Sequence, residues 1–495
     1  MRLRTLPVLL LVAAALVPAC TPNRAHLVPP VAPGAPVVPA PEAAAVQPIE
    51  LEVTGDLANR FVEAGRAGEV LARIRIHSPE SRDTERPRAN IGLVVDTSGS
   101  MEGDAIVQAR AAALTLLGDL RDGDVLSVIT FGSSPQVLVP ATVLDAKTRP
   151  TIRTDMERMK ATGTTDLAGG LAAGLQQVQS QARQGEINRI VLVSDGVPND
   201  EAPIMGLAQQ ARNVGVPITA LGLGLEYHET LLGQIAANSG GKFHFVEDPT
   251  KVASVFREEV LSIDRLAARA VALTLTPGPG VAIVDVPGFS IGYSGRSAVL
   301  GLPDLAEGDT QQVIVRLAVS EHRDGATVEL LDGVVTYADA RTSAGMERRT
   351  FVSARATADA EELAKGVDLD VSVAAARATT AAATLQIVSM ARAGDVKGAQ
   401  AMLDRTLGAG RTLSETMPDA ELARLLDDLV ELRPTLPGLA PQPVAVDRRS
   451  GAKGKTGSIA MGVDEAPQPV PTPSPASARG VRASHERAYK VLHGN

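Results

Sequence analysis

The chain has 495 residues, which is more than one hydrophobic core usually organises, so roughly two to four domains joined by linkers are expected. Apolar residues make up 44% of it and charged residues 21%, as in globular proteins, while 45 glycines and 33 prolines indicate turns and flexible segments. A formal net charge of -9 and an aromatic content of 2% argue against nucleic acid as a partner, because nucleic-acid binding needs a basic face and stacking side chains.

The first 20 residues have the architecture of a secretory signal peptide. Arg2 and Arg4 precede an apolar run over residues 6–16, which is too short to span a bilayer as a mature helix. Residues 17–20 resemble the lipobox of bacterial lipoproteins, and that resemblance implies that Cys20 is acylated and becomes the first residue of the mature protein. The alternative is a soluble exported protein that is cleaved nearby, in which Cys20 has no special role.

Cys20 is the sole cysteine of the sequence, so it has no partner for an intramolecular disulfide. The lipobox resemblance implies a protein held in the bacterial cell envelope by its acyl chains, and several chains anchor far more firmly than one. Thr21 follows the cysteine at the position where an aspartate signals inner-membrane retention in enterobacteria. This favours the outer membrane over the inner membrane.

Three segments outside the centre of the chain have simple patterns. Residues 21–48 are rich in Pro, Ala and Val with almost no charge, which predicts a semi-extended tether. Apolar and polar residues alternate over residues 49–87, and the alternation returns over residues 264–355, which predicts half-buried strands. We therefore expect these two segments to form one discontinuous β-sandwich.

Residues 88–263 have a different pattern, in which short, fully apolar runs alternate with helical stripes. This is typical of a parallel sheet that is covered by helices on both faces. The sequence therefore predicts a doubly wound, mostly parallel, Rossmann-like α/β domain. The apolar runs are residues 91–95, 125–131, 190–193 and 218–221, and the helical stripes are residues 106–117, 167–178 and 204–211.

The C-terminal part of the chain divides into a helical region and a tail. Residues 356–436 are rich in Ala and Leu at helical spacing, and glycines at residues 394 and 408–410 are expected to break the helices. Residues 437–495 are rich in Pro, Ser, Gly and Lys, so a low-complexity, mostly disordered tail is expected, ending in a short helix.

Polar side chains follow two of the central apolar runs. Asp96, Ser98 and Ser100 come directly after the first run, and Asp195 follows the run of residues 190–193. A further loop, residues 163–166, places hydroxyl groups at the start of a predicted helix. Because ligands of open α/β sheets bind at the carboxyl ends of strands, these oxygen atoms are expected to gather at one edge. Hard divalent cations prefer such ligands.

These three loops together resemble the metal-ion-dependent adhesion site of von Willebrand factor type A domains, over about residues 88–263. The resemblance implies that three hydroxyls coordinate a cation directly and that two carboxylates often act through water. Thr165 is chosen over Thr164 because the family threonine lies two residues after the loop glycine. The implied metal-binding residues are Asp96, Ser98, Ser100, Thr165 and Asp195.

The resemblance also implies a function without catalysis. The cation is expected to be Mg²⁺, with Mn²⁺ or Ca²⁺ as alternatives, and a shell of about six oxygens leaves one position for an acidic side chain of a protein partner. The chain is therefore expected to be a cation-dependent protein-binding or adhesion module on an envelope lipoprotein, and not an enzyme.

Three other interpretations remain open. Asp and Ser after a strand often cap the next helix, so these loops could be purely structural. The chain could be a scaffold lipoprotein whose metal site is structural. It could also be a metal-assisted hydrolase, for which Asp166 is the one nearby general base that the sequence offers.

Overall fold

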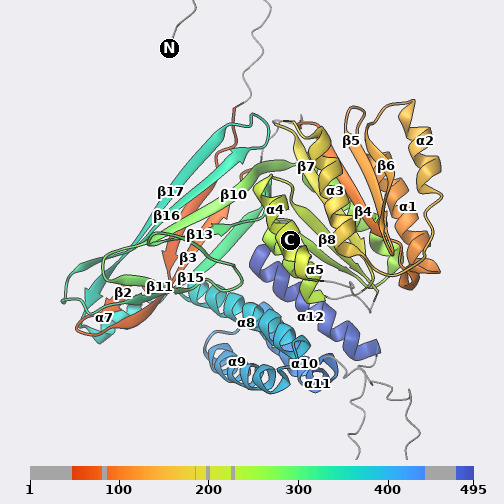
Figure 1. Ribbon diagram of the computed structural model, residues 1–495. Helices are drawn as coiled ribbons and strands as arrows, with labels where there is room; N and C mark the ends of the chain where they lie inside the picture. The colour runs from red at the N-terminus through yellow and green to blue at the C-terminus, as the bar shows by residue number, and fades with distance from the viewer. Residues whose placement is uncertain are drawn as a thin grey trace, which may run out of the picture. The chain divides into compact units, whose positions relative to one another are not determined.

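The computed structural model describes residues 47–80, 86–183, 185–196, 201–224, 229–440 and 475–494 (Figure 1). The predicted signal peptide, Cys20 and nearly all of the predicted tether lie outside the described residues, so those predictions are neither supported nor contradicted. The described chain contains a six-stranded α/β domain, two further sheets that share a core, and a set of C-terminal helices.

A six-stranded sheet forms the centre of the α/β domain, in the order β6-β5-β4-β7-β8-β9. Five strands run parallel, and β6 pairs antiparallel with β5 at one edge. Every residue of β4 and β5 is buried, which explains their unbroken apolar runs. The strands are β4 (Ala89–Asp96), β5 (Val125–Phe131), β6 (Pro135–Val143), β7 (Ile187–Ser194), β8 (Ile218–Leu223) and β9 (Phe243–Val246).

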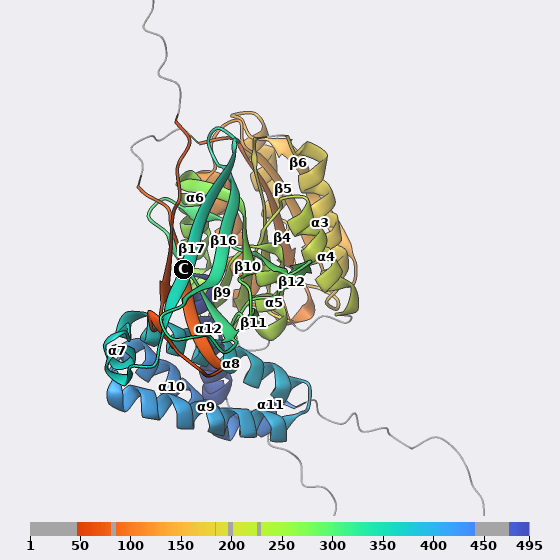
Figure 2. The same cartoon turned by 90° about the vertical axis from the view of Figure 1, so that its left-hand side faces the viewer.

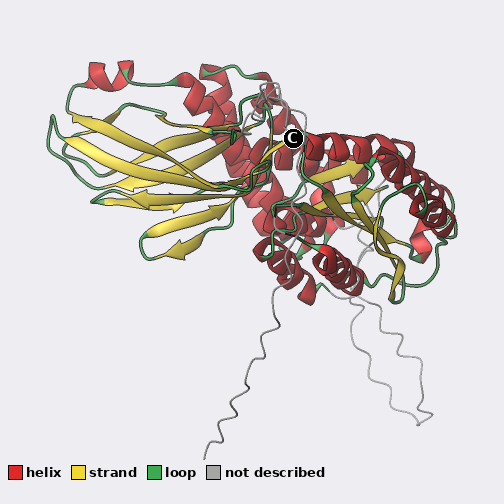
Figure 3. Cartoon of the chain, turned by 90° about the horizontal axis from the view of Figure 1, so that it is seen from above, coloured by secondary structure: helices red, strands yellow, loops and turns green. Residues whose placement is uncertain are grey.

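Helices cover both faces of this sheet (Figure 3). Helices α1, α2 and α6 share one apolar core with the strands, and α3, α4 and α5 share a second core on the opposite face. The predicted doubly wound, mostly parallel fold is therefore confirmed. The helices are α1 (Asp104–Asp119), α2 (Thr148–Met156), α3 (Leu167–Gln181), α4 (Ala202–Asn213), α5 (Glu229–Ser239) and α6 (Val252–Asp264).

Two largely antiparallel sheets share another core and form a β-sandwich. Their orders are β1-β3-β15-β11 and β12-β13-β10-β16-β17-β2, with β14 paired to β10. Strand β3 precedes the α/β domain and pairs along its whole length with β15, which follows it, so the α/β domain is an insertion in the sandwich. The strands are β1 (Glu52–Leu57), β2 (Phe61–Glu63), β3 (Gly68–His77), β10 (Leu266–Pro277), β11 (Val281–Asp285), β12 (Gly292–Ser294), β13 (Ser297–Gly301), β14 (Leu305–Ala306), β15 (Thr310–Val319), β16 (Thr327–Asp339) and β17 (Gly345–Thr357).

The helical region follows the sandwich, with α8, α9 and α10 packed together (Figure 2). Asp368, Asp395 and Asp419 directly precede these three helices as N-caps, and each side chain accepts a hydrogen bond from a backbone N–H of the first turn. The helices are α7 (Ala360–Lys365), α8 (Leu369–Arg392), α9 (Val396–Thr416), α10 (Ala420–Leu432) and α11 (Leu436–Leu439).

The break predicted at the glycines of residues 408–410 is wrong. Helix α9 continues through them to Thr416, whereas the break predicted at Gly394 is present. A Cβ on Gly410 would meet the Leu426 side chain of α10, so this glycine lets two helices approach closely instead of ending one. Close helix packing requires a small residue there, and that requirement depends on a contact between distant parts of the sequence.

Helix α8 has the length and composition to cross a membrane, and it is the one such helix among the described residues. Half of its apolar window is buried inside the fold, however, and α8 packs against α9, α10 and the last described helix, α12 (Pro475–His493). The position of α8 in the core of the helical region therefore explains its apolar character.

The last described helix, α12 (Pro475–His493), has 19 residues and is longer than the short terminal helix expected from the sequence. Val481, Tyr489 and Leu492 are buried, and the Tyr489 hydroxyl donates to the Gly241 carbonyl at 3.1 Å. Burial also lowers the pKa of His493 to about 4. The helix therefore packs against both the α/β domain and the helical region. Residues 441–474 of the predicted tail lie outside the described part.

Candidate metal centre

Asp96 is the last residue of β4, and its carboxylate is held on both sides. It is fully buried; Oδ1 accepts from the backbone N–H of Ser98 at 2.8 Å, and Oδ2 accepts from the Ser194 hydroxyl at 2.7 Å. Burial raises the pKa of Asp96, while the hydrogen bonds from Ser98 and Ser194 act in the opposite direction. The position of this carboxylate is therefore fixed by the end of its own strand and by the end of β7.

Ser98, Ser100 and Asp195 form a chain of polar contacts next to this carboxylate. The hydroxyl oxygens of Ser98 and Ser100 lie 3.1 Å apart, and the Ser100 hydroxyl donates to Asp195 Oδ1 at 2.8 Å. Ser98 and Asp195 are buried, whereas Ser100 is exposed on the short 3₁₀ helix Gly99–Met101. The loop after β4 and the loop after β7 are thus joined directly through side chains.

The loop before α3 is held against these two loops by backbone hydrogen bonds. Gly99 N–H donates to the Gly163 carbonyl at 3.0 Å, and Thr162 N–H donates to the Thr97 carbonyl at 2.5 Å. Gly163 has a φ of +88°, a conformation that favours glycine. These contacts place the buried Thr165 side chain beside the loop that follows β4.

Oxygen atoms from the loop after β4 and the loop before α3 converge at Gly196, which belongs to the loop after β7. A Cβ atom placed on this glycine would lie 3.2 Å from Thr165 Oγ1, 3.5 Å from Ser100 Oγ and 3.6 Å from Asp96 Oδ2. The absence of a side chain at this position leaves space among the three oxygens. The structure therefore brings together the residues that the sequence singled out, and their donor set of hydroxyls and carboxylates fits a hard divalent cation.

The two neighbouring threonines have different surroundings. Thr164 N–H donates to Ser133 Oγ at 3.1 Å, and the hydroxyls of Thr164 and Ser133 are also hydrogen-bonded, at 3.4 Å. Thr165 is the one whose hydroxyl lies beside Gly196. This geometry favours Thr165 over Thr164 as a possible ligand.

Helix capping does not account for the polar residues after β4. Helix α1 begins after Gly103, which makes no side-chain cap, and Ser98 makes no cap hydrogen bond to the 3₁₀ helix that follows it. Asp166, in contrast, does cap: its Oδ1 accepts from Gly169 N–H at 2.9 Å at the start of α3. The carboxylate considered as a general base therefore has a structural task.

Ser194 is not among the site residues predicted from the sequence. This residue is fully buried at the end of β7, and its hydroxyl holds Asp96 Oδ2. Its only signal in the sequence is its position immediately before Asp195. Among the described residues, no three His, Cys, Asp or Glu side chains gather as a metal cluster, so a cation held here depends on the serine and threonine hydroxyls as well as the two carboxylates.

The doubly wound sheet and the oxygen atoms gathered on its loops are the features of the von Willebrand factor type A class of domains. Residues 90–258 match the family model of the von Willebrand factor type A domain, and this part of the chain is such a domain. The match lies within the 88–263 segment predicted from the sequence.

Three relatives illustrate the extent of the similarity. The uncharacterized protein sll0103 of Synechocystis sp. is 28% identical over 216 residues, which cover 43% of this chain and 51% of that protein. The uncharacterized protein YfbK of Escherichia coli is 26% identical over 196 residues, which cover 38% of this chain and 34% of that protein. Inter-alpha-trypsin inhibitor heavy chain H1 of Mesocricetus auratus is 30% identical over 173 residues, which cover 32% of this chain and 19% of that protein. The similarity thus spans about half or less of each relative's length.

A solved structure, von Willebrand factor type A from Catenulispora acidiphila, resembles a larger part of the chain. The TM-score is 0.64 at 18% sequence identity, and the match covers 79% of this chain and 91% of that one. At this identity the likeness concerns the fold alone. Because it extends well beyond residues 90–258, it includes more than the α/β domain.

Proposed function

We propose that the von Willebrand factor type A domain binds a divalent cation and captures a protein ligand through an acidic side chain of that ligand. Domains of this class are in general metal-dependent protein-interaction modules. The observation that carries the proposal is the convergence of three oxygen atoms, from Asp96, Ser100 and Thr165, at Gly196. The proposed cation ligands are Asp96, Ser98, Ser100, Thr165 and Asp195.

The chain supplies an incomplete set of ligands. Mg²⁺ takes about six oxygens and usually keeps several waters, so three hydroxyls and two carboxylates leave room for an incoming group. Once bound, the cation supplies an electrophilic contact for a carboxylate of the partner. Mn²⁺ and Ca²⁺ accept the same kinds of oxygen ligand, and Mg²⁺ is the cation that we propose.

The hydrogen bonds of Asp96 support an indirect role for its carboxylate. Both of its oxygens already accept hydrogen bonds, from Ser98 N–H and from the Ser194 hydroxyl. A carboxylate held in this way orients neighbouring groups and water with less donation of its own charge to the cation. The cation then keeps more of its attraction for the acidic side chain of the partner.

Peptide display provides a test of ligand capture. Peptides selected on the mature chain in Mg²⁺ are expected to carry Asp or Glu, to dissociate in EDTA, and to rebind when Mg²⁺ is restored. Changing the acidic residue of a selected peptide to its amide should abolish binding, as should Asp96→Ala in the protein. Selected peptides without acidic residues, or binding that survives EDTA, would contradict the proposal.

The same experiment separates the two alternatives. A scaffold with a purely structural cation would lose stability in the Asp96→Ala variant but would still capture its peptides. A metal-assisted hydrolase needs a general base beside the cation, and the nearest candidate, Asp166, is the N-cap of α3. That observation favours binding over hydrolysis.

We further propose that acyl chains on Cys20 hold the protein in the bacterial cell envelope, at the outer membrane. The lipobox resemblance of residues 17–20 supports this proposal. In a bacterial host fed labelled palmitate, the wild-type chain should acquire the label and fractionate with outer membranes. The Cys20→Ser chain should do neither; retention of the label in that variant would overturn the proposal.

A further inference from the structure

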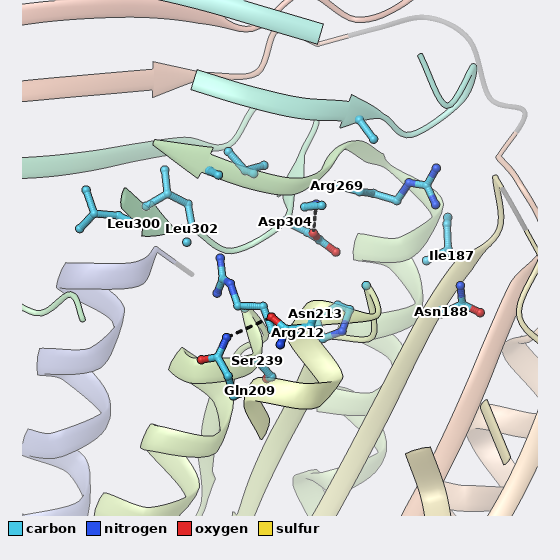
Figure 4. Close-up of a pocket in the computed structure, with 18 of the residues that line it drawn as sticks. Ile187, Asn188, Gln209, Arg212, Asn213, Ser239, Arg269, Leu300, Leu302 and Asp304 are labelled. Carbon is cyan, nitrogen blue, oxygen red and sulfur yellow. Dashed lines mark hydrogen bonds between the residues drawn. The ribbon is translucent and has the colours of Figure 1, made fainter. Parts of the chain in front are cut away.

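A cavity of about 480 Å³ lies between the α/β domain and the sandwich (Figure 4). Its walls include the end of α4, the residues that lead into β8, and the strands β10 and β13. Ile187, the first residue of β7, and Pro217, which directly precedes β8, line it, whereas the candidate metal centre follows the ends of strands. The cavity is therefore separate from that centre, and its volume is within the range of small-molecule sites.

Arg212 projects into this cavity from the last turn of α4 (Figure 4). Its side chain is partly buried, and its guanidinium lies so close over Gly301 of β13 that a Cβ there would overlap it. No described residue forms a hydrogen bond or an ion pair with this guanidinium. Burial lowers the pKa of Arg212, and the charge of Asp304 only partly offsets that effect.

Arg269 brings a second guanidinium to the cavity, from β10 on the facing wall. Its Nη1 donates to the Glu186 carbonyl at 2.5 Å and its Nη2 donates to Ser343 Oγ at 3.0 Å. Its Nε is buried, with no hydrogen-bond partner in the described part of the chain. Burial lowers the pKa of Arg269 as well, against the charges of Asp304 and Asp339.

Asp304 is the one carboxylate among the described residues that line the cavity. Its Oδ2 lies 3.2 Å from Nη2 of Arg189, which is not a lining residue, and its Oδ1 accepts from Ala270 N–H at 3.1 Å. The lining thus carries two guanidiniums and a single carboxylate that is already engaged. This leaves a surplus of one positive charge.

A partly buried cation without a partner needs a physical explanation, because burying an uncompensated charge is costly. The carbonyl end of α4 attracts Arg212, but a helix dipole compensates only a small part of such a cost. Contact with solvent offsets another part of this cost, because the Arg212 side chain is only partly buried. A bound anion would satisfy Arg212 and the free Nε of Arg269 together, and guanidinium groups bind carboxylates through paired hydrogen bonds.

We propose that this cavity binds a small organic carboxylate, with Arg212 as its principal cation. A monoanion matches the single surplus charge, whereas a phosphate dianion exceeds it and would be repelled more strongly by Asp304. The apolar part of the ligand would lie against Val299 and Ala272, which are lining residues with partly exposed side chains. Asn188 and Gln209 bring amide groups to the same cavity for any further polar atoms of the ligand.

The test uses the mature chain and three carboxylates, namely acetate, butyrate and benzoate, at constant ionic strength. Calorimetry is expected to give a Kd below about 10 mM for at least one of them and no binding of benzamide, the neutral analogue of benzoate. The Arg212→Gln variant should bind that carboxylate at least about tenfold more weakly, because a charge-assisted pair is lost. Arg212→Lys keeps the positive charge but loses the planar pair of N–H donors. Its affinity for the carboxylate should lie between that of the wild type and that of Arg212→Gln.

Arg66→Gln is the matched control, because it removes one positive charge from an exposed surface position and should leave binding unchanged. If Arg212→Gln failed to fold, Arg212→Lys and Arg269→Gln would decide the question by the same comparison. The proposal is overturned if none of the three acids binds the wild type, if Arg212→Gln and Arg66→Gln bind equally well, or if inorganic phosphate binds in place of the carboxylates. The Asp96→Ala variant should bind the carboxylate like the wild type.

Discussion

Replacing Glu259 with alanine is expected to lower the free energy of unfolding by about 3–5 kcal/mol, the usual cost of breaking a buried ion pair. Glu259 is 2% exposed, and its carboxylate contacts Arg189 Nη1 at 3.2 Å, Thr219 Oγ1 at 2.8 Å and His244 Nε2 at 3.1 Å. Arg189 is itself buried, so the variant would leave a guanidinium without its main partner. Among the described residues, the contact with Asp304 would be the one ion pair left to Arg189.

Chemical denaturation of the mature chain would measure this loss. Glu259→Gln, which keeps a polar side chain for Thr219, should lose less stability than Glu259→Ala. Glu258→Ala is the matched control, because the neighbouring Glu258 is exposed and its replacement should change stability by less than about 0.5 kcal/mol. Equal stability of the Glu258 and Glu259 variants would show that the buried network contributes nothing.

The same network gives the sign of a pH effect. Burial alone would raise the pKa of Glu259, but the hydrogen bond and charge of His244 and the charge of Arg189 outweigh it and hold the pKa below the ordinary value of 4.5. The folded state therefore binds this proton less readily than the unfolded state. The contribution to stability is present above pH 4.5 and is lost as the pH falls below it, and Glu259→Ala should lack this part of the acid sensitivity.

Replacing Thr165 with valine is expected to weaken cation binding by at least about tenfold, at the lower end of the losses seen when groups around a metal are removed. Valine keeps the volume of the buried side chain and removes only the hydroxyl beside Gly196. Thr164→Val is the matched control and should change the affinity by less than about twofold, because its hydroxyl contacts Ser133 instead.

Calorimetric titration with Mg²⁺ and Mn²⁺ would compare the two threonine variants. The opposite order of affinities would identify Thr164 as the ligand and would contradict the assignment. Gly196→Val is a useful third variant, because it changes no proposed ligand but fills the space between the three oxygens. Its affinity should also fall.

The local pattern of the sequence was sufficient for the α/β domain and for the neighbourhood of its site. Fully apolar runs at residues 91–95 and 125–131 became β4 and β5, because a strand covered on both faces has no polar side to interrupt the run. Parallel strands end at one edge of the sheet, so the loop residues that follow them had to lie together. That Asp96 and its neighbours bind a cation remains a prediction.

The contacts that hold the site could not be predicted, because they join loops that are distant in the sequence. Ser194 positions Asp96 across 98 residues, and Glu259 meets Arg189 across 70. A charged residue within the apolar strand around Arg189 was nevertheless a signal, since a buried charge requires a partner. Its partner could not be named without the fold.

Helix α12 and the glycines of α9 mark another limit of local patterns. The buried residues of α12 include Arg482, Ser484 and His485, so its packed face has no continuous apolar stripe. Gly410 resembles a helix breaker until the side chain of Leu426 is placed beside it. In both cases the tertiary contact, and not the propensity of the segment, determines the structure.

The most direct test of the proposed function is a calorimetric titration of the mature chain with Mg²⁺, Mn²⁺ and Ca²⁺, beside the Asp96→Ala/Ser98→Ala double variant. We expect the wild type to bind a single divalent cation. The affinity of the double variant should be lower by about a hundredfold or more. Both proteins should have the same circular dichroism spectrum. A wild-type chain that binds none of the three cations, or a double variant that binds as well as the wild type, would contradict the assignment of this site.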